Sequence, residues 1–182
     1  MFWLARFRSV VVRLMLVSAL LLPAQSVAAQ HVAGNIGSMP GSTEQRLADA
    51  LSAIGMTRCA TRTVQVGRFL MEGSDANFTV QPLGPNGDMW PTVITMESSH
   101  PDNGTTRLSI ISISPNCAGF YQQTIYWNQP CSLLRSGTFA AFTGAQRLLA
   151  NVTVSELDVA TQLYLMPAGE QGCVSVKKEL FR

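Results

Sequence analysis

Short segments of alternating apolar residues, separated by turn clusters, dominate the middle of this chain. Turn residues gather at 72–75, 83–88 and 98–104. Because the connections between the segments are short, neighbouring strands are expected to pair antiparallel. The pattern predicts strands near residues 64–70, 78–80, 90–96, 108–113, 120–127, 152–154, 163–166 and 173–176.

Two stretches have the spacing of helices. Residues 42–55 begin with a capping-box sequence at Ser42, in which Ser42 and Gln45 would satisfy free backbone N–H groups. Leu47, Leu51 and Ile54 then fall on one helical face, and Gly55 suits the helix end. Pro130 suits the first turn of a second helix over 130–141. The predicted class is α+β, a single domain with a mainly antiparallel sheet and two helices packed on one face.

The N-terminus has the features of a cleavable secretory signal. Three arginines precede an apolar run of residues 14–22, and small residues follow at 26–29. The run is shorter than the roughly 20 residues that span a bilayer, although an uncleaved anchor is the alternative. We therefore expect a signal peptide over 1–29, a flexible leader over 30–41 and one α+β domain over 42–182, located in the periplasm or secreted.

The charge balance excludes two classes of partner. The chain has 13 basic and 11 acidic residues, and loss of the three signal arginines leaves a mature domain with a formal charge of −1. Basic residues do not cluster beyond Lys177 and Lys178. The prediction is that the protein binds no nucleic acid and has no stable membrane insertion after signal cleavage.

Four cysteines in an exported chain predict two disulfides. Of the three possible pairings we expect Cys117–Cys131, around one strand, and Cys59–Cys173, near the two ends of the domain. A zinc site and a redox-active pair are the alternatives. No two cysteines have C-x-x-C spacing, which disfavours both. We therefore predict no cofactor and no metal.

Catalytic signals are sparse. His100 lies in Ser98-Ser99-His100-Pro101-Asp102, which brings together the residue types of a hydrolase triad. Triads are usually assembled from distant segments, so a solvated turn is the preferred interpretation. We predict no catalytic residue, and we keep a hydrolase using His100 as a minor alternative.

Aromatic residues supply the most suggestive functional feature. The predicted binding surface comprises Trp90, Tyr121, Gln123, Tyr126 and Trp127. Core packing is the preferred explanation of the aromatic residues, and a functional surface is the alternative. If they project from the sheet face without helices, they would form a partner or ligand surface.

The C-terminal third resembles small exported proteobacterial proteins that have no known activity. The resemblance lies in Tyr126-Trp127, Cys131, Phe139, residues 165–169 and residues 172–179. It implies a Gram-negative exported protein and identifies no functional residue.

These observations favour an exported, non-catalytic accessory protein. It would bind another protein or an envelope component through a sheet surface. The alternative is a periplasmic carrier that holds a small hydrophobic ligand or lipid between sheet and helices. In that case Trp90, Tyr121 and Trp127 would line the pocket.

Overall fold

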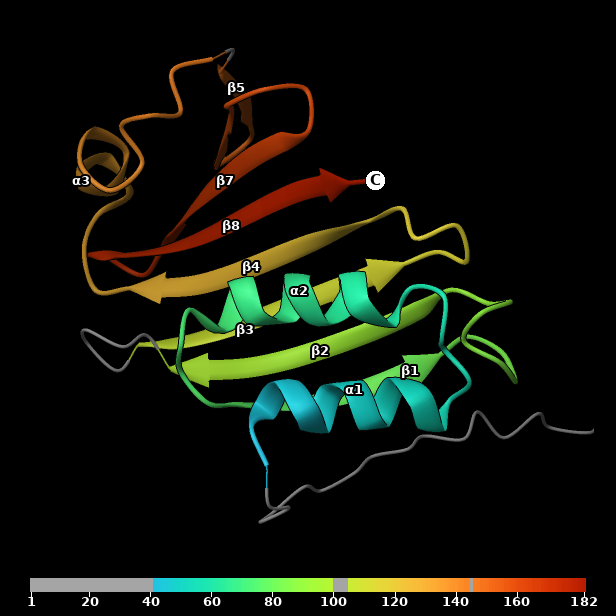
Figure 1. The fold of residues 1–182 in the computed structure, drawn as a ribbon. Helices are drawn as coiled ribbons and strands as arrows, with labels where there is room; N and C mark the ends of the chain where they lie inside the picture. Colours follow the sequence, from blue (N-terminus) through green and yellow to red (C-terminus); the bar gives the residue numbers. More distant parts are fainter. Residues whose placement is uncertain (1–40, 100–104, 145) are drawn as a thin grey trace, which may run out of the picture.

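Helices on one side of an eight-stranded antiparallel sheet make up the fold of the computed structural model (Figure 1). The structure describes residues 41–99, 105–144 and 146–182. Its elements are α1 (Thr43–Ala53), α2 (Ala60–Met71), β1 (Ala76–Pro82), β2 (Thr92–Ser99), β3 (Thr106–Ile113), β4 (Gly119–Trp127), α3 (Cys131–Ser136), β5 (Gln146–Leu149), β6 (Val152–Glu156), β7 (Thr161–Ala168) and β8 (Gly172–Phe181). The predicted α+β class, with helices packed on an antiparallel sheet, is confirmed.

The first helix forms where its cap predicts. The Ser42 hydroxyl accepts the backbone N–H of Gln45 at 3.2 Å, and Gly55 follows the helix with φ +71°. The Gln45 side chain does not complete the predicted box, because it donates to the Asp49 carboxylate instead. Leu47 and Leu51 are fully buried. Capping and one apolar stripe together therefore determine α1.

The strand predicted near residues 64–70 is wrong, because this segment is helix α2. Its buried residues include Thr63, Gly67 and Leu70, whose spacing follows a helix. Gly67 lets α1 approach closely, since a Cβ there would lie 2.7 Å from Leu47. The β-branched residues Val64 and Val66 favour a strand only weakly, and tertiary packing against α1 overrides that preference.

The strand order is β1-β2-β3-β4-β8-β7-β6-β5. The first four strands form a meander, after which the chain crosses over and returns through β8 beside β4. The other predicted strands all form, and β5 is an additional edge strand that the pattern did not predict. Helix α3 ends at Ser136, earlier than the predicted residue 141, because Gly137 leaves the helical conformation.

Two separate hydrophobic clusters lie under the helices. The larger packs α1 and α2 on β1–β4 around residues such as Leu51, Ile94 and Ile111. The smaller packs Leu134 of α3 against Leu163 and Leu165 of β7 and against β8. By strand alternation these sheet residues share one face, so all three described helices lie on that face.

Both disulfides form, but the predicted pairing is wrong. The bonds are Cys59–Cys117 and Cys131–Cys173. Cys117 precedes β4 and Cys131 follows it, and this nine-residue strand separates them by about 30 Å. A disulfide allows Cα atoms to lie at most about 7 Å apart. The predicted Cys117–Cys131 bond is therefore impossible, and Cys59–Cys173 fails with it.

Several predictions concern residues outside the described part. The signal peptide over 1–29, most of the 30–41 leader and the His100 turn belong here. None of the described helices is long and apolar enough to span a membrane.

Candidate functional site

Strand β4 divides the predicted binding residues between the two faces of the sheet. Tyr121 packs in the larger cluster and Trp127 against the smaller one, so both point toward the helices. Gln123 lies between them by alternation and shares that face. Tyr126 points the other way and is 52% exposed. Only Tyr126 among the predicted residues of β4 therefore lies on the face that carries none of the described helices, which we call the helix-free face.

Side chains that are apolar except for Thr124 run across this helix-free face in two rows. We name them the bare-face strip. One row follows the register through Leu108, Thr124, Val176 and Tyr164, and the other through Tyr126, Val174 and Met166. The strip therefore crosses four adjacent strands, β3, β4, β8 and β7.

Exposure changes along the bare-face strip. Leu108 on β3 is 44% exposed, whereas Val176 and Tyr164 are half-buried. The next residue along that row, Val154 of β6, is fully buried. The open part of the strip therefore lies over β3, β4 and β8, and Tyr126 and Leu108 are the most exposed large apolar side chains of the strip itself.

Polar residues border the bare-face strip. Gln122 and Lys178 face each other on β4 and β8, and Gln162 of β7 accepts a hydrogen bond from the Tyr164 hydroxyl at 2.8 Å. The Lys178 ammonium lies 4.7 Å from the centre of the Phe120 ring. An apolar centre with a polar border is the usual composition of a protein interface.

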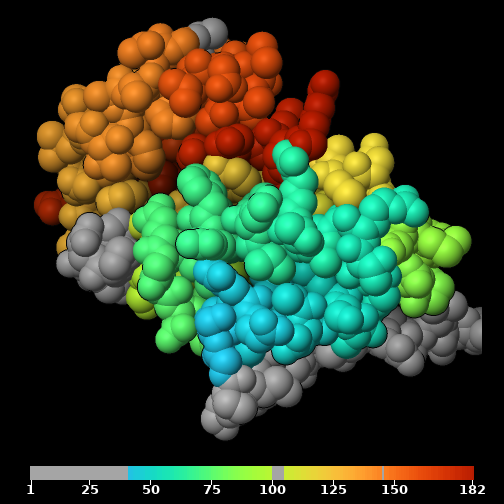
Figure 2. All heavy atoms as spheres, in the orientation of Figure 1, coloured from blue at the N-terminus to red at the C-terminus, as the bar shows by residue number. Residues whose placement is uncertain are grey.

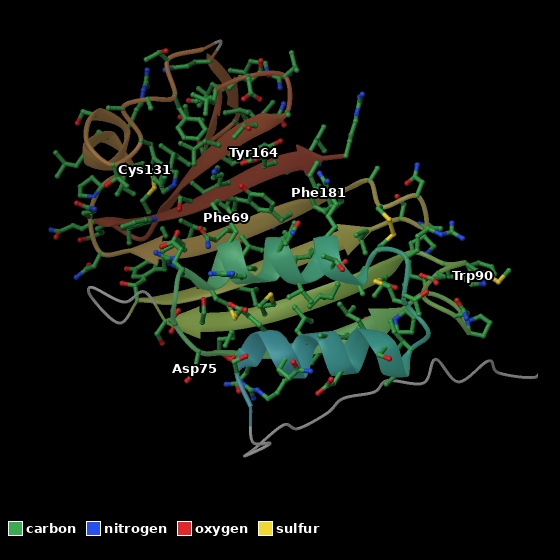
Figure 3. The ribbon with its side chains drawn as sticks, viewed as in Figure 1. Phe69, Asp75, Trp90, Cys131, Tyr164 and Phe181 are labelled. Carbon is green, nitrogen blue, oxygen red and sulfur yellow. A yellow bond between two sulfur atoms is a disulfide. The ribbon has the colours of Figure 1, made fainter. Side chains whose placement is uncertain are left out.

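A second candidate site is a groove of about 300 Å³ on the helix-bearing face, between α2 and β8. In Figure 2 the groove lies where the teal surface of α2 meets the dark red surface of β8. Phe69 and Phe181 point into the space between α2 and β8 (Figure 3). The lining residues are Arg62, Gln65, Val66, Phe69, Tyr121, Glu179 and Phe181.

Three side chains beside the groove satisfy one another. The Tyr121 hydroxyl donates to the Glu179 carboxylate and accepts from the Lys177 ammonium at 3.3 Å. Lys177 also pairs with Glu179 at 3.2 Å. Burial raises the pKa of Tyr121, and the hydrogen bond to Glu179 and its negative charge raise it further. The phenol therefore stays protonated at neutral pH and is unsuited to act as a base.

The two tryptophans of the prediction lie elsewhere. Trp90 belongs to the loop between β1 and β2 and packs on Gly84, where any Cβ would meet its ring. Figure 3 places Trp90 far from Tyr164. Trp127 donates to the Ser175 hydroxyl at 2.8 Å and meets the Phe139 ring edge-on. The predicted surface is therefore not one site, and of the three carrier residues only Tyr121 lines the groove.

Sequence reasoning missed Arg62, Val66 and Phe69, which form one edge of the groove. Their spacing of four and then three residues is helical. The signal was present, but treating the segment as a strand placed these residues on alternating faces. Glu179 and Phe181 carried no comparable signal, because only the pairing of β8 with β4 brings them to Tyr121 and α2.

The described residues provide no metal site and no free thiol. No group of three or more His, Cys, Asp or Glu among them could hold an ion, and their four cysteines are all in disulfides. Comparison of the chain with models of protein families, with curated proteins and with solved structures finds no match. The resemblance of the C-terminal third to exported proteobacterial proteins therefore stays a prediction.

Proposed function

We propose that this chain is an exported, non-catalytic accessory protein that binds another protein through the bare-face strip. The observation that carries the proposal is the pair Tyr126 and Leu108, which are 52% and 44% exposed on a face that no described helix covers. Large apolar side chains in such a position are stabilised by association with a second apolar surface.

A protein fits the bare-face strip better than other partners do. Nucleic acid would require a basic surface, and the strip itself contains no Lys or Arg. Tyr126 offers a large apolar ring and a hydroxyl together, which is why tyrosine is enriched where interfaces bind most strongly. Two disulfides support export to an oxidising compartment, where such an accessory protein would act.

Site-specific photo-crosslinking tests the proposal. A photoreactive amino acid placed at 126 or 108, in cells of the natural host, is expected to give the same crosslinked protein. A probe at Leu133, which is 58% exposed on α3, is the matched control and should not give it. Identical adducts from all three positions would contradict a specific surface.

The affinity of the identified partner provides the second test. Tyr126→Glu should weaken binding by about thirtyfold or more, the effect of losing a central interface residue. Leu133→Glu adds the same charge to an apolar residue elsewhere and should leave the affinity unchanged. Thermal melting of both variants verifies that each remains folded, and equal binding by the two would refute the proposal.

A further inference from the structure

The groove between α2 and β8 has the composition of a small-ligand site. Its volume of about 300 Å³ lies at the lower end of the range for ligand pockets. Phe69, Phe181 and Tyr121 supply aromatic surface, and the rings of Phe69 and Tyr121 are in contact, with their centres 5.6 Å apart. The groove therefore offers apolar surface to a ligand about as large as one aromatic ring with a short chain.

Two cations of the protein already lie beside the three aromatic rings of the groove. The Lys177 ammonium lies 5.8 Å from the centre of the Phe69 ring and 5.7 Å from that of Tyr121. The Arg62 guanidinium lies 5.6 Å from the centre of the Phe181 ring. Aromatic side chains with a carboxylate could otherwise bind a cationic ligand. Here such a ligand would meet two positive charges and only the one carboxylate of Glu179.

The polar groups of the groove differ in whether their charge is already compensated by a neighbouring side chain. Glu179 accepts from Tyr121 and pairs with Lys177, so its charge is already compensated. Arg62 is exposed, and among the described residues no carboxylate lies within ion-pair distance of it. A guanidinium presents five N–H donors and binds a carboxylate with two parallel hydrogen bonds. The available charge therefore selects an anion.

We propose that this groove binds a small monocarboxylate that has a single aromatic ring. The carboxylate pairs with Arg62, and the ring packs against Phe69 and Phe181 above Tyr121. The proposal is independent of the proposed function, because the groove and the bare-face strip lie on opposite faces of the sheet. Failure of one leaves the other unaffected.

Titration of the purified protein, expressed from the full chain, with 3-phenylpropanoate tests the proposal. Backbone amide NMR should show saturable shifts at α2 and β8. The neutral 3-phenylpropanamide should bind about tenfold more weakly, since it lacks the charge-assisted hydrogen bonds. The cation 3-phenylpropylammonium should be weaker still. Absence of saturation up to the solubility limit, or tighter binding of the cation, would overturn the proposal.

Two arginines of α2 supply a matched pair of variants. Arg62→Gln should bring the affinity for the carboxylate down to that of the amide. Arg68→Gln removes the same charge from the same helix, at a residue that pairs with Glu44 at 3.4 Å, and should change neither affinity. Phe181→Ala should weaken carboxylate and amide alike. If Arg62→Gln retains the preference for the carboxylate, or both arginine variants lose it equally, Arg62 is not the anion receptor and the proposal fails.

Discussion

The helix-bearing face of the sheet carries two cores of very different size. Among the described residues, fourteen buried side chains form the cluster under α1 and α2, whereas four form the cluster under α3. We call α1, α2 and β1–β4 the first half, and α3 with β5–β8 the second half. Each half has one disulfide, Cys59–Cys117 in the first and Cys131–Cys173 in the second. Buried apolar area stabilises roughly in proportion to its extent. The second half therefore depends far more on its covalent link than the first.

The exposed apolar residues show the same difference. Leu148 and Leu149 of the edge strand β5 are 71% and 55% exposed, and Val159 in the turn after β6 is fully exposed. In the first half the edge strand β1 instead alternates buried and exposed residues, including buried Phe78 and Val80. The first half thus has a regular core, and the second is a thin extension of the sheet.

Removal of the disulfides tests this comparison with the largest expected effect. The chain-entropy model gives about 4 kcal/mol for either bond, since the sequence separations are 58 and 42. The location of the loss should differ. Cys131→Ala/Cys173→Ala should abolish the hydrogen-exchange protection of β5–β7 and leave β1–β3 protected.

The matched variant is Cys59→Ala/Cys117→Ala. Here the large core should keep the amides of β1–β3 protected from hydrogen exchange as long as the whole protein stays folded. Hydrogen exchange followed by mass spectrometry measures both variants. If the two give the same pattern of protection along the chain, the halves are not independent in the way the core sizes indicate.

Truncation of one core residue in each half should give the next largest effect. Ile94→Ala should lower the free energy of unfolding by about 3 kcal/mol, because the packed surroundings cannot collapse into the cavity. Leu165→Ala should cost about 2 kcal/mol, because the small cluster can relax. Urea unfolding measures both, and a larger loss from Leu165→Ala would reverse the comparison.

Buried charge also distinguishes the halves. Arg107 in the first half has a side chain only 4% exposed, and its Nη1 lies 2.8 Å from Glu72 Oε2. Within the described residues neither Nε nor Nη1 has a hydrogen-bond partner, so the ion pair with Glu72 compensates this buried charge. Glu72→Gln should cost about 1 to 2 kcal/mol, less than for a fully buried pair because Glu72 is 47% exposed.

The control for that substitution is Glu156→Gln in the second half. Glu156 pairs with Arg147 at 3.3 Å, where Arg147 is 60% exposed, so the loss should be below about 0.5 kcal/mol. Urea unfolding of both variants gives the difference. Equal losses would mean that burial of Arg107 adds nothing to the strength of its pair.

Acid should produce the smallest effect and should act on both halves. A hydrogen bond from the Thr57 hydroxyl, with others from the Arg58 and Thr57 backbones, lowers the pKa of Asp88. Backbone hydrogen bonds from Ala160 and Thr161 similarly lower the pKa of Asp158.

A lowered folded-state pKa contributes stability that is complete above the ordinary value of 3.8 and is lost as the pH falls through the folded value. The free energy of unfolding should therefore decrease less between about pH 5 and about pH 3 in Asp88→Asn and Asp158→Asn than in the parent chain. A fall of the same size in the variants would exclude these carboxylates as its source.

Much of the fold could be predicted from local patterns, and the exceptions have identifiable causes. The cap at Ser42 and the alternation in β1–β4 each depend on neighbouring residues, so the sequence revealed them directly. Helix α2 was mistaken for a strand because its valines favour β structure and its helical face became apparent only against α1. The disulfide pairing could have been corrected in part, since a strand over 120–127 already separates Cys117 from Cys131.

The candidate sites were less predictable than the fold. By strand alternation Tyr121 and Trp127 lie on the face opposite Tyr126, but no local signal in the sequence says which face the helices cover. The groove needs α2 and the pairing of β4 with β8, which brings Tyr121 to Glu179, 58 positions away in the sequence. Contacts between such distant residues depend on the free energy of the complete packed structure, so no local sequence pattern predicts them.

By itself the sequence determined the α+β class, the antiparallel meander and the oxidation of all four cysteines, because each follows from short-range spacing or from the predicted export. Only the tertiary structure decided the disulfide partners, the helical state of α2 and the assignment of Tyr126 to the bare face and Tyr121 to the groove. Those outcomes depend on which distant segments become neighbours, and burial of apolar surface selects among the possible arrangements only when the complete chain packs.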